Sequence, residues 1–337
     1  MPFDGGCVSA APSREGFGAG VSMTLLAIFI WGTQLPIAKA VYGSVDGTTL
    51  SLLRYLVAIV GFAGVLLWRE GTAAFAFDGH GRIATIAGAG MAASAILVFG
   101  GLTFTRPESA AIILALQPAV TALMQWGLYR RRPAGYTLLC MLVAFVGVLL
   151  VVTRGGETLG LGMSGLPEPS GRAITSPTGS DREWLGNLMV LVGMVGWVTY
   201  TVITSSLSNW SSARVSTLTT IPTLGFLFAA WLIGLPLGLT GFPHDVDTGI
   251  AVRLVYVSLF GALIAMLLWN SGARRIGALN AVLLANLTPV VTFATRAVEG
   301  VVLSAAELAG AALVVGALGV NSVLQRRERL RTGAAST

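Results

Sequence analysis

The sequence predicts an all-α membrane protein with ten transmembrane helices in two inverted repeats of five. Three observations predict this fold: a scarcity of charged residues, ten long apolar runs, and motifs that recur in each half. Charged residues make up 11% of the 337 residues and hydrophobic residues 54%, whereas a soluble domain carries about 25% charged residues. So few charges cannot cover a water-facing surface of this size, so the bilayer is expected to be the main solvent.

The apolar runs divide the chain into two sets of five. A membrane-spanning helix needs ~20 mostly apolar residues. Runs of this length cover residues 21–41, 48–68, 83–103, 108–128, 134–153, 185–206, 215–238, 250–271, 276–298 and 302–322. A segment rich in Gly, Ser and Pro follows the fifth run and is typical of a flexible linker. We therefore expect a tail (1–20), a first half (21–153), an extracytoplasmic linker (154–184), a second half (185–325) and a second tail (326–337).

The loop arginines predict the orientation. Cytoplasmic loops carry an excess of Lys and Arg. With the N-terminus inside, thirteen arginines fall in cytoplasmic segments and six in outer ones. We therefore expect both termini in the cytoplasm. The net charge of +6 is then a property of these loops and indicates no nucleic-acid partner.

The two halves resemble each other. Residues 101–121 align without gaps with residues 272–292, and the identities include Gly101/Gly272 and Pro118/Pro289. "WGTQLPIAKA" in the first span likewise matches "WVTYTVITSS" in the sixth. Because five is odd, the second half must enter the membrane from the opposite side. This is the inverted repeat of many secondary transporters, in which two similar halves expose one central site alternately to each side.

Several motifs mark particular spans. They are "WGTQLPIAK" in the first span, "LLRYL" at 52–56, the prolines of spans four and nine, and "VEGVVLSAAELAGAALVVGALGV" after Pro289. Together they resemble the EamA family of the drug/metabolite transporter superfamily over roughly residues 20–325. The first half departs from the pattern, since "LYRRRP" stands where the second half has "AVEG". A role that the family resemblance implies for the glutamate of "AVEG" is therefore assigned only to Glu299, in the second half.

The resemblance implies a bacterial inner-membrane exporter of small metabolites, most similar to exporters of aromatic or neutral amino acids. Export of drugs or other cations, sugars or nucleosides stays open, as do a non-transporting membrane component and a lipid-acting enzyme. No HExxH, P-loop or GxSxG pattern is present, so we expect no enzymatic activity and no cofactor or metal. The expected partners are a small-molecule substrate and the bilayer, and monomer and homodimer both stay open.

Polar and aromatic side chains within the spans are the candidates for substrate binding. They are Gln34, Lys39, Ser94, Gln117, Trp197, Tyr200, Asn270 and Asn286. A polar group in hydrocarbon needs a partner, so each either binds substrate or bonds a neighbouring helix. Gln34 and Tyr200 fall at matching repeat positions. Trp126 and Trp269 lie toward span ends, where an interfacial belt is expected.

Lys39 is the only lysine in the chain. It either extends to the outer headgroups or lines the cavity and meets a substrate carboxylate. Pro36 removes a backbone donor just before it and is expected to loosen the helix as a hinge. Gly32 is expected to allow close helix packing.

Pro118 and Pro289 interrupt spans four and nine at the same repeat position. We expect them to be hinges for alternating access. Carboxylates are rare, and none lies at the middle of a span. This favours facilitated export down a gradient, although proton coupling through Glu108 or Glu307 stays open.

Overall fold

The computed structural model describes residues 14–129, 133–153, 182–204, 206–207, 209–276, 281 and 284–334, and these are almost entirely helical. The first half contains α1 (Arg14–Lys39), α2 (Gly47–Glu70), the short η1 (Thr72–Phe75), α3 (Gly81–Gly101), α4 (Pro107–Leu114), α5 (Gln117–Tyr129) and α6 (Gly135–Val152). The second half contains α7 (Glu183–Thr204), α8 (Ser212–Gly234), α9 (Thr248–Val255), the π-helix η4 (Tyr256–Ile264), α10 (Ala265–Ile276), α12 (Thr288–Val298) and α13 (Ala305–Ala334).

Nine helical segments in the described part of the chain are long and apolar enough to cross a membrane. They correspond to the first eight and the tenth of the expected spans. The ninth expected span, 276–298, includes residues outside the described part, and α12 belongs to it. Large apolar side chains such as Val60, Leu142 and Ile233 face outward, where lipid is their natural solvent.

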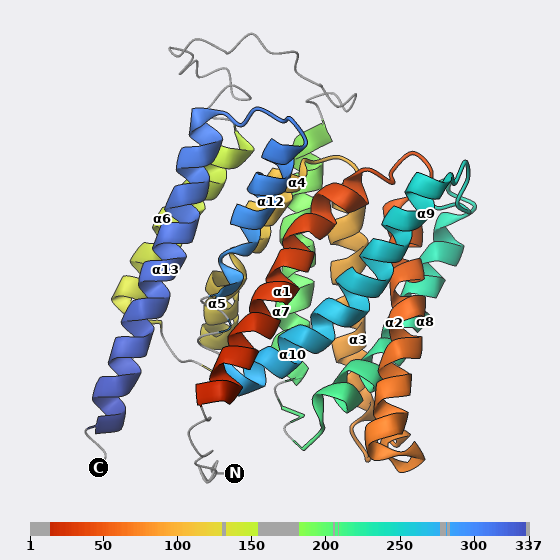
Figure 1. Cartoon of the computed structure of the whole chain (residues 1–337), viewed down its shortest axis with the longest axis horizontal. Helices are drawn as coiled ribbons and strands as arrows, with labels where there is room; N and C mark the ends of the chain where they lie inside the picture. The colour runs from red at the N-terminus through yellow and green to blue at the C-terminus, as the bar shows by residue number, and fades with distance from the viewer. Residues whose placement is uncertain are drawn as a thin grey trace.

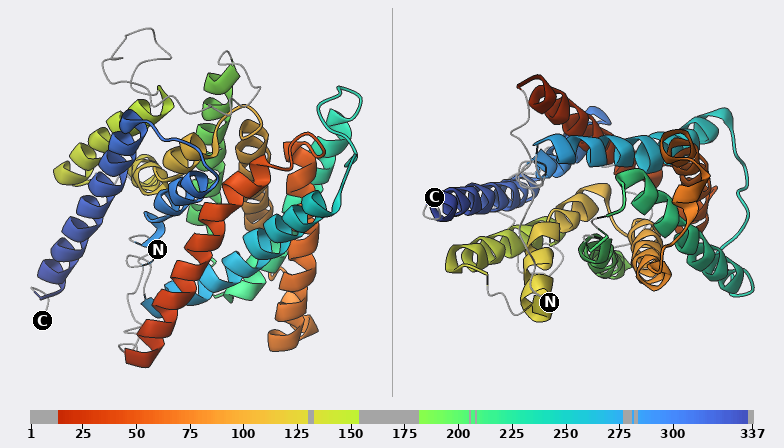
Figure 2. Two further views of the ribbon diagram at one scale, coloured as in Figure 1. Left: turned by 45° about the horizontal axis from the view of Figure 1, so that its top comes forward. Right: turned by 90° about the horizontal axis from the view of Figure 1, so that it is seen from below.

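The two halves interleave rather than lying side by side. The most extensive helix contacts combine the halves (Figures 1 and 2): α3 packs against α7, α1 against α10, α2 against α8, and α6 against α13. The third span of each half thus packs against the first span of the other half. A two-fold relation between the halves requires this reciprocity.

Matching glycines make two of these crossings close. A Cβ atom on Gly101 would lie 2.7 Å from the carbonyl oxygen of Gly186, and one on Gly186 would lie 2.7 Å from that of Gly101. In the other half, a Cβ on Gly272 would lie 2.9 Å from the carbonyl oxygen of Gly20. Gly272 is the repeat partner of Gly101. In the register that pairs Trp31 with Trp197, Gly20 is likewise the repeat partner of Gly186. The same small-residue crossing is therefore built twice.

Side-chain caps fix where the second helix of each half begins. Asp46 accepts hydrogen bonds from the backbone N–H groups of Thr48 and Thr49, both at 2.9 Å. Ser211 accepts one from Arg214 N–H at 3.0 Å. Such caps satisfy N–H groups that a helix start leaves without partners. At the chain's ends the helices exceed the expected spans, since α1 begins at Arg14 and α13 runs to Ala334.

Candidate functional site

An aromatic cluster lies between the first spans of the two halves. The ring centroids of Trp31 and Trp197 are 6.5 Å apart, edge to face. Trp269 lies 5.4 Å from Trp31, and Tyr200 lies 5.6 Å from Trp197. We call these four residues the aromatic cluster. Trp269, expected in an interfacial belt, is partly buried and its ring packs against Trp31.

A buried arginine lies beside Gln34. Arg54 Nη2 donates to Gln34 Oε1 at 3.1 Å, and Arg54 Nε donates to the Val257 carbonyl at 3.3 Å. The guanidinium lies over the Phe99 ring, 3.9 Å from its centroid. Arg54 and Gln34 are each only 6% exposed. We call Arg54, Gln34, Phe99 and the Val257 carbonyl the arginine site.

Arg54 was not among the site residues expected from the sequence, although the motif "LLRYL" contains it. A central arginine costs roughly 2.5–3.5 kcal/mol on insertion scales. Arg54 is the eighth residue of α2, so it lies roughly 10 Å along the helix from its start. A charge at that depth is a signal that could have identified this residue.

The π-helix η4 connects the arginine site to the aromatic cluster. A Cβ on Gly261 would lie 1.9 Å from Gln34 Oε1, so only glycine leaves room for Gln34 here. Trp31 Nε1 donates to the carbonyl of that same Gly261 at 3.1 Å. Gln34, proposed as a ligand, and Trp31 therefore meet at one residue. π-Helical turns within α-helices are frequent at functional sites.

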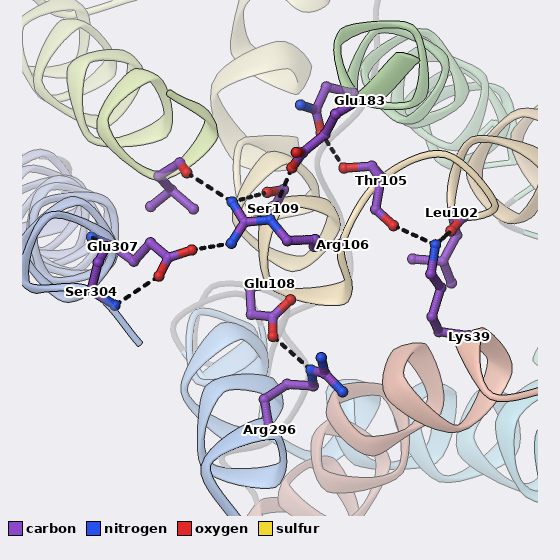
Figure 3. A network of polar contacts seen from close by, with 12 residues as sticks. Lys39, Leu102, Thr105, Arg106, Glu108, Ser109, Glu183, Arg296, Ser304 and Glu307 are labelled. Carbon is purple, nitrogen blue, oxygen red and sulfur yellow. Dashed lines mark hydrogen bonds and ion pairs between the residues drawn. The ribbon is translucent and has the colours of Figure 1, made fainter. Parts of the chain in front are cut away.

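Ion pairs join the two halves at the upper end of the bundle in Figure 1, and Figure 3 shows them closely. Arg106 Nε bonds Glu183 Oε1 at 2.9 Å, and Arg106 Nη1 pairs with Glu307. Arg296 Nε bonds Glu108 Oε1 at 2.6 Å. Each of these pairs links one half to the other. With Lys39, these residues form what we call the ion-pair network.

Arg106, at the centre of the network, stays charged over a wide pH range. Burial by itself lowers the pKa of Arg106, but the charges and hydrogen bonds of Glu307 and Glu183 raise this pKa above its ordinary value. Glu307 also helps to cap the start of α13, since its carboxylate accepts from Ser304 N–H at 2.8 Å while Ser304 Oγ accepts from Glu307 N–H at 3.1 Å. This reciprocal capping box holds Glu307 in place.

Lys39 has partners that neither sequence interpretation foresaw. Its Nζ donates to the carbonyl oxygens of Leu102, Thr103 and Thr105 at 2.7, 2.9 and 2.9 Å. Figure 3 shows the bonds to Leu102 and Thr105. These carbonyls lie just past the C-terminal end of α3, where the helix dipole favours a cation. In this structure Lys39 therefore fastens the end of α1 to the end of α3.

Spans four and nine are broken rather than kinked. Two-residue turns at 115–116 and 286–287 interrupt them, and these turns coincide in the repeat alignment. Pro118 and Pro289 are each the second residue of the helix that follows. Proline is tolerated there because the N–H it lacks would have no helical partner.

Pro36, by contrast, lies inside the continuous helix α1. A proline in a helix leaves the carbonyl four residues earlier without its usual donor. Thr292 Oγ1 supplies that donor, bonding the Gly32 carbonyl at 2.8 Å. Gly32 also permits close packing as expected, because a Cβ there would lie 2.6 Å from Val291 Cβ. Pro36 thus creates an attachment point between α1 and α12.

The other proposed site residues are dispersed. Ser94 lies at the α3–α7 crossing, where its backbone nitrogen is 3.0 Å from a Cβ built on Gly196. Gln117 begins α5. Asn270 Nδ2 lies 3.5 Å from Ser216 Oγ, a contact between α10 and α8. Asn286, in the turn of span nine, is buried, and its Nδ2 has no hydrogen-bond partner among the described residues.

The chain is similar to known proteins over most of its length. It is 26% identical over 315 residues to the uncharacterized transporter YrdR of Bacillus subtilis (strain 168), covering 92% of each chain. It is 28% identical over 234 residues to the uncharacterized transporter YyaM of the same organism, covering 68% of this chain and 69% of YyaM. A solved crystal structure at 19% identity matches with a TM-score of 0.62, over 92% of this chain and 99% of that one.

The family comparison covers both halves. Residues 18–153 and 184–323 match the model of the EamA-like transporter family. The two matched segments flank the linker, as the repeat predicts. The chain is a polytopic membrane transporter, and it belongs to the EamA-like transporter family.

Proposed function

We propose that this transporter exports small metabolites, amino acids foremost, by exposing a central site alternately to each side of a bacterial inner membrane. The observation that carries the proposal is the matching break in spans four and nine. Broken helices occur within membranes where backbone groups line a cavity or meet a substrate. Here the breaks lie at equivalent points of two inverted halves, so the same rearrangement is available in both directions.

The broken span nine also carries a free polar group. Asn286 Nδ2 is buried without a partner in the described part of the chain, and a buried donor left unpaired costs about 1–3 kcal/mol. A substrate oxygen would remove that cost. The aromatic cluster offers apolar area for an aromatic or neutral side chain. These features support an amphiphilic substrate such as an amino acid.

The ion-pair network joins the two halves at one end of the bundle, and we propose that it keeps this end closed. The arginine distribution of the loops supports an extracytoplasmic position for this end, with both termini in the cytoplasm. Export then requires Arg106 to separate from Glu183 and Glu307, and Arg296 from Glu108. Because Glu108 and Glu307 are both paired with arginine, we propose facilitated export rather than proton coupling through these acids.

A cross-linking experiment tests the alternating mechanism. Cys7 and Cys140 are replaced by Ala, and Arg106 and Glu307 by Cys, in protein reconstituted into liposomes. A bifunctional, cleavable thiol reagent is expected to abolish counterflow of neutral amino acids, and reduction of the linker should restore it. Matched cysteines at Tyr136 and Glu328, which contact each other on α6 and α13, provide the control and should leave transport active after cross-linking.

Running the assay with and without an imposed proton gradient tests the coupling. Facilitated export predicts equal counterflow in both conditions. Counterflow that survives the Arg106–Glu307 cross-link would refute alternation at this end. A wild-type protein that moves no amino acid would refute the substrate proposal.

A further inference from the structure

Arg54 is a buried cation whose partners are all neutral. They are the Gln34 amide oxygen, the Val257 carbonyl oxygen and the Phe99 ring. A buried charge is normally paired with an opposite charge. No carboxylate among the described residues forms an ion pair with Arg54. The arginine site therefore carries an uncompensated positive charge within the membrane.

The acid at the start of the same helix is engaged elsewhere. Asp46 Oδ1 accepts from the N–H groups of Thr48 and Thr49, and its Oδ2 accepts from Thr49 Oγ1 and from Gly241 N–H at 3.0 Å. These four bonds occupy both carboxylate oxygens of Asp46, which caps α2 and also binds Gly241. A counter-ion for Arg54 must therefore come from outside the described residues.

The guanidinium is held in a fixed orientation with one edge unused. Nε and one hydrogen of Nη2 are bonded, and the Phe99 ring fixes the plane from below. Nη1 has no hydrogen-bond partner in the described part of the chain. An arginine has five N–H donors in a planar fork that matches the two oxygens of a carboxylate. The unused edge of Arg54 is thus a preorganised receptor for such a group.

We propose that Arg54 binds the carboxylate of the transported molecule, which makes the substrate class carboxylate-bearing metabolites, zwitterionic amino acids included. This inference rests on the proposed transport function. Gly261 joins the aromatic cluster to the arginine site, because Gln34 and Trp31 both contact it. An aromatic or neutral amino acid satisfies both parts of the site. Organic cations are poor substrates, since Arg54 would repel them.

A binding measurement tests the assignment directly. The unfolding temperature of purified protein is measured with L-phenylalanine, with 3-phenylpropionate and with L-phenylalaninamide, which lacks the carboxylate. We expect the two carboxylates to raise the unfolding temperature and the amide not to. Arg54→Gln should lose the shift and Arg54→Lys should keep part of it. The control Arg69→Gln, at the exposed end of the same helix, should keep all of it.

A second variant decides the question even where Arg54→Gln does not fold. Gln34→Glu places a carboxylate beside Arg54 and supplies the missing counter-ion from within the protein. We expect this variant to unfold at a higher temperature than wild type and to lose the response to L-phenylalanine. Gln34→Leu, which removes the amide without adding a charge, should not gain stability.

The outcomes separate this inference from the proposed function. Equal shifts with carboxylate and amide, no shift with either carboxylate, or an unchanged response in Gln34→Glu would overturn the role of Arg54. Carboxylate binding without counterflow in liposomes would refute transport of these compounds and leave the carboxylate receptor standing. Counterflow of L-phenylalaninamide as fast as L-phenylalanine would preserve transport and refute the receptor.

Discussion

Trp31 and Trp197 occupy matching positions in the two halves, and their rings meet edge to face with centroids 6.5 Å apart. Residues related by a two-fold axis touch each other only close to that axis. The pair therefore marks where the inverted halves cross, and any movement of one half against the other must change this contact. The interaction free energy of these two side chains therefore reports how strongly the halves are coupled.

A double-mutant cycle on the two tryptophans should show this coupling. Trp31→Leu and Trp197→Leu are each expected to destabilise, and together to destabilise by less than their sum, with a coupling of about 1 kcal/mol. Free energies of unfolding by denaturant titration in micelles provide the measurement. Trp68, which is 82% exposed at the end of α2, is the control partner, and its effect should add to that of Trp31→Leu. An additive Trp31/Trp197 pair would contradict the contact.

The ion-pair network predicts a change in accessibility at one end of the bundle. Glu307→Gln removes one of the two carboxylates that hold Arg106. Ser109 is fully buried beside Arg106, so a cysteine there should react slowly with a membrane-impermeant maleimide. We expect Glu307→Gln to accelerate this reaction several-fold in a background without Cys7 and Cys140.

Asp78→Asn is the control for that experiment. Asp78, in the loop between η1 and α3, pairs with Arg214 in the first turn of α8. This pair lies at the opposite end of the bundle from the network. The variant removes an ion pair between the halves but lies far from the network. Labelling at position 109 should stay at the unmodified rate, and a rise in this variant would mean that labelling reports general loosening.

Lys39 should behave as a structural residue. Lys39→Met removes the donor to three carbonyls near the end of α3 and is expected to lower the free energy of unfolding by about 2–4 kcal/mol. The stabilisation by L-phenylalanine should persist, because Arg54 and Gln34 are unchanged. If the variant instead has normal stability but no longer responds to L-phenylalanine, Lys39 and not Arg54 would be the carboxylate receptor.

The close approach at Gly261 predicts a specific cost. In Gly261→Ala the new methyl would overlap Gln34 Oε1, which lies 1.9 Å from the Cβ position. Gln34 must then turn away and leave Arg54 with one acceptor fewer, a loss of about 1–3 kcal/mol. Gly64 on α2 has nothing within 4 Å of its Cβ position, so Gly64→Ala should instead stabilise by up to about 1 kcal/mol. Equal effects at the two glycines would contradict this geometry.

Much of the fold could be predicted from the sequence because a bilayer imposes simple rules. Span length follows from membrane thickness, and an odd number of spans per half fixes the inversion. The Gly101/Gly272 identity falls where α3 crosses α7 and where α10 crosses α1, since small residues allow helices to approach closely in a membrane. These are local properties of the chain, and a single sequence displays them.

The site was less predictable because its partners are distant in sequence. Arg106 and Glu307 are separated by 201 residues, and no periodicity brings such a pair together. The positions of Lys39 and Arg54 within spans were visible, but the carbonyls and the amide that meet them belong to other helices. The sequence also could not separate a kink from a break at Pro118 and Pro289, since both place a proline at mid-span.

Pro36 and Thr292 should be energetically coupled through the Gly32 carbonyl. Thr292→Val removes the hydroxyl that donates to that oxygen and is expected to cost about 1–3 kcal/mol. Pro36→Ala restores a backbone N–H that can bond the same oxygen within α1. In the Pro36→Ala background, Thr292→Val should therefore cost at least about 1 kcal/mol less. Thr295, whose hydroxyl bonds Val291 O within its own helix at 2.8 Å, is the control, and Thr295→Val should cost the same in both backgrounds. If the Thr292 cost is also unchanged, the proline does not create the attachment of α12 to α1.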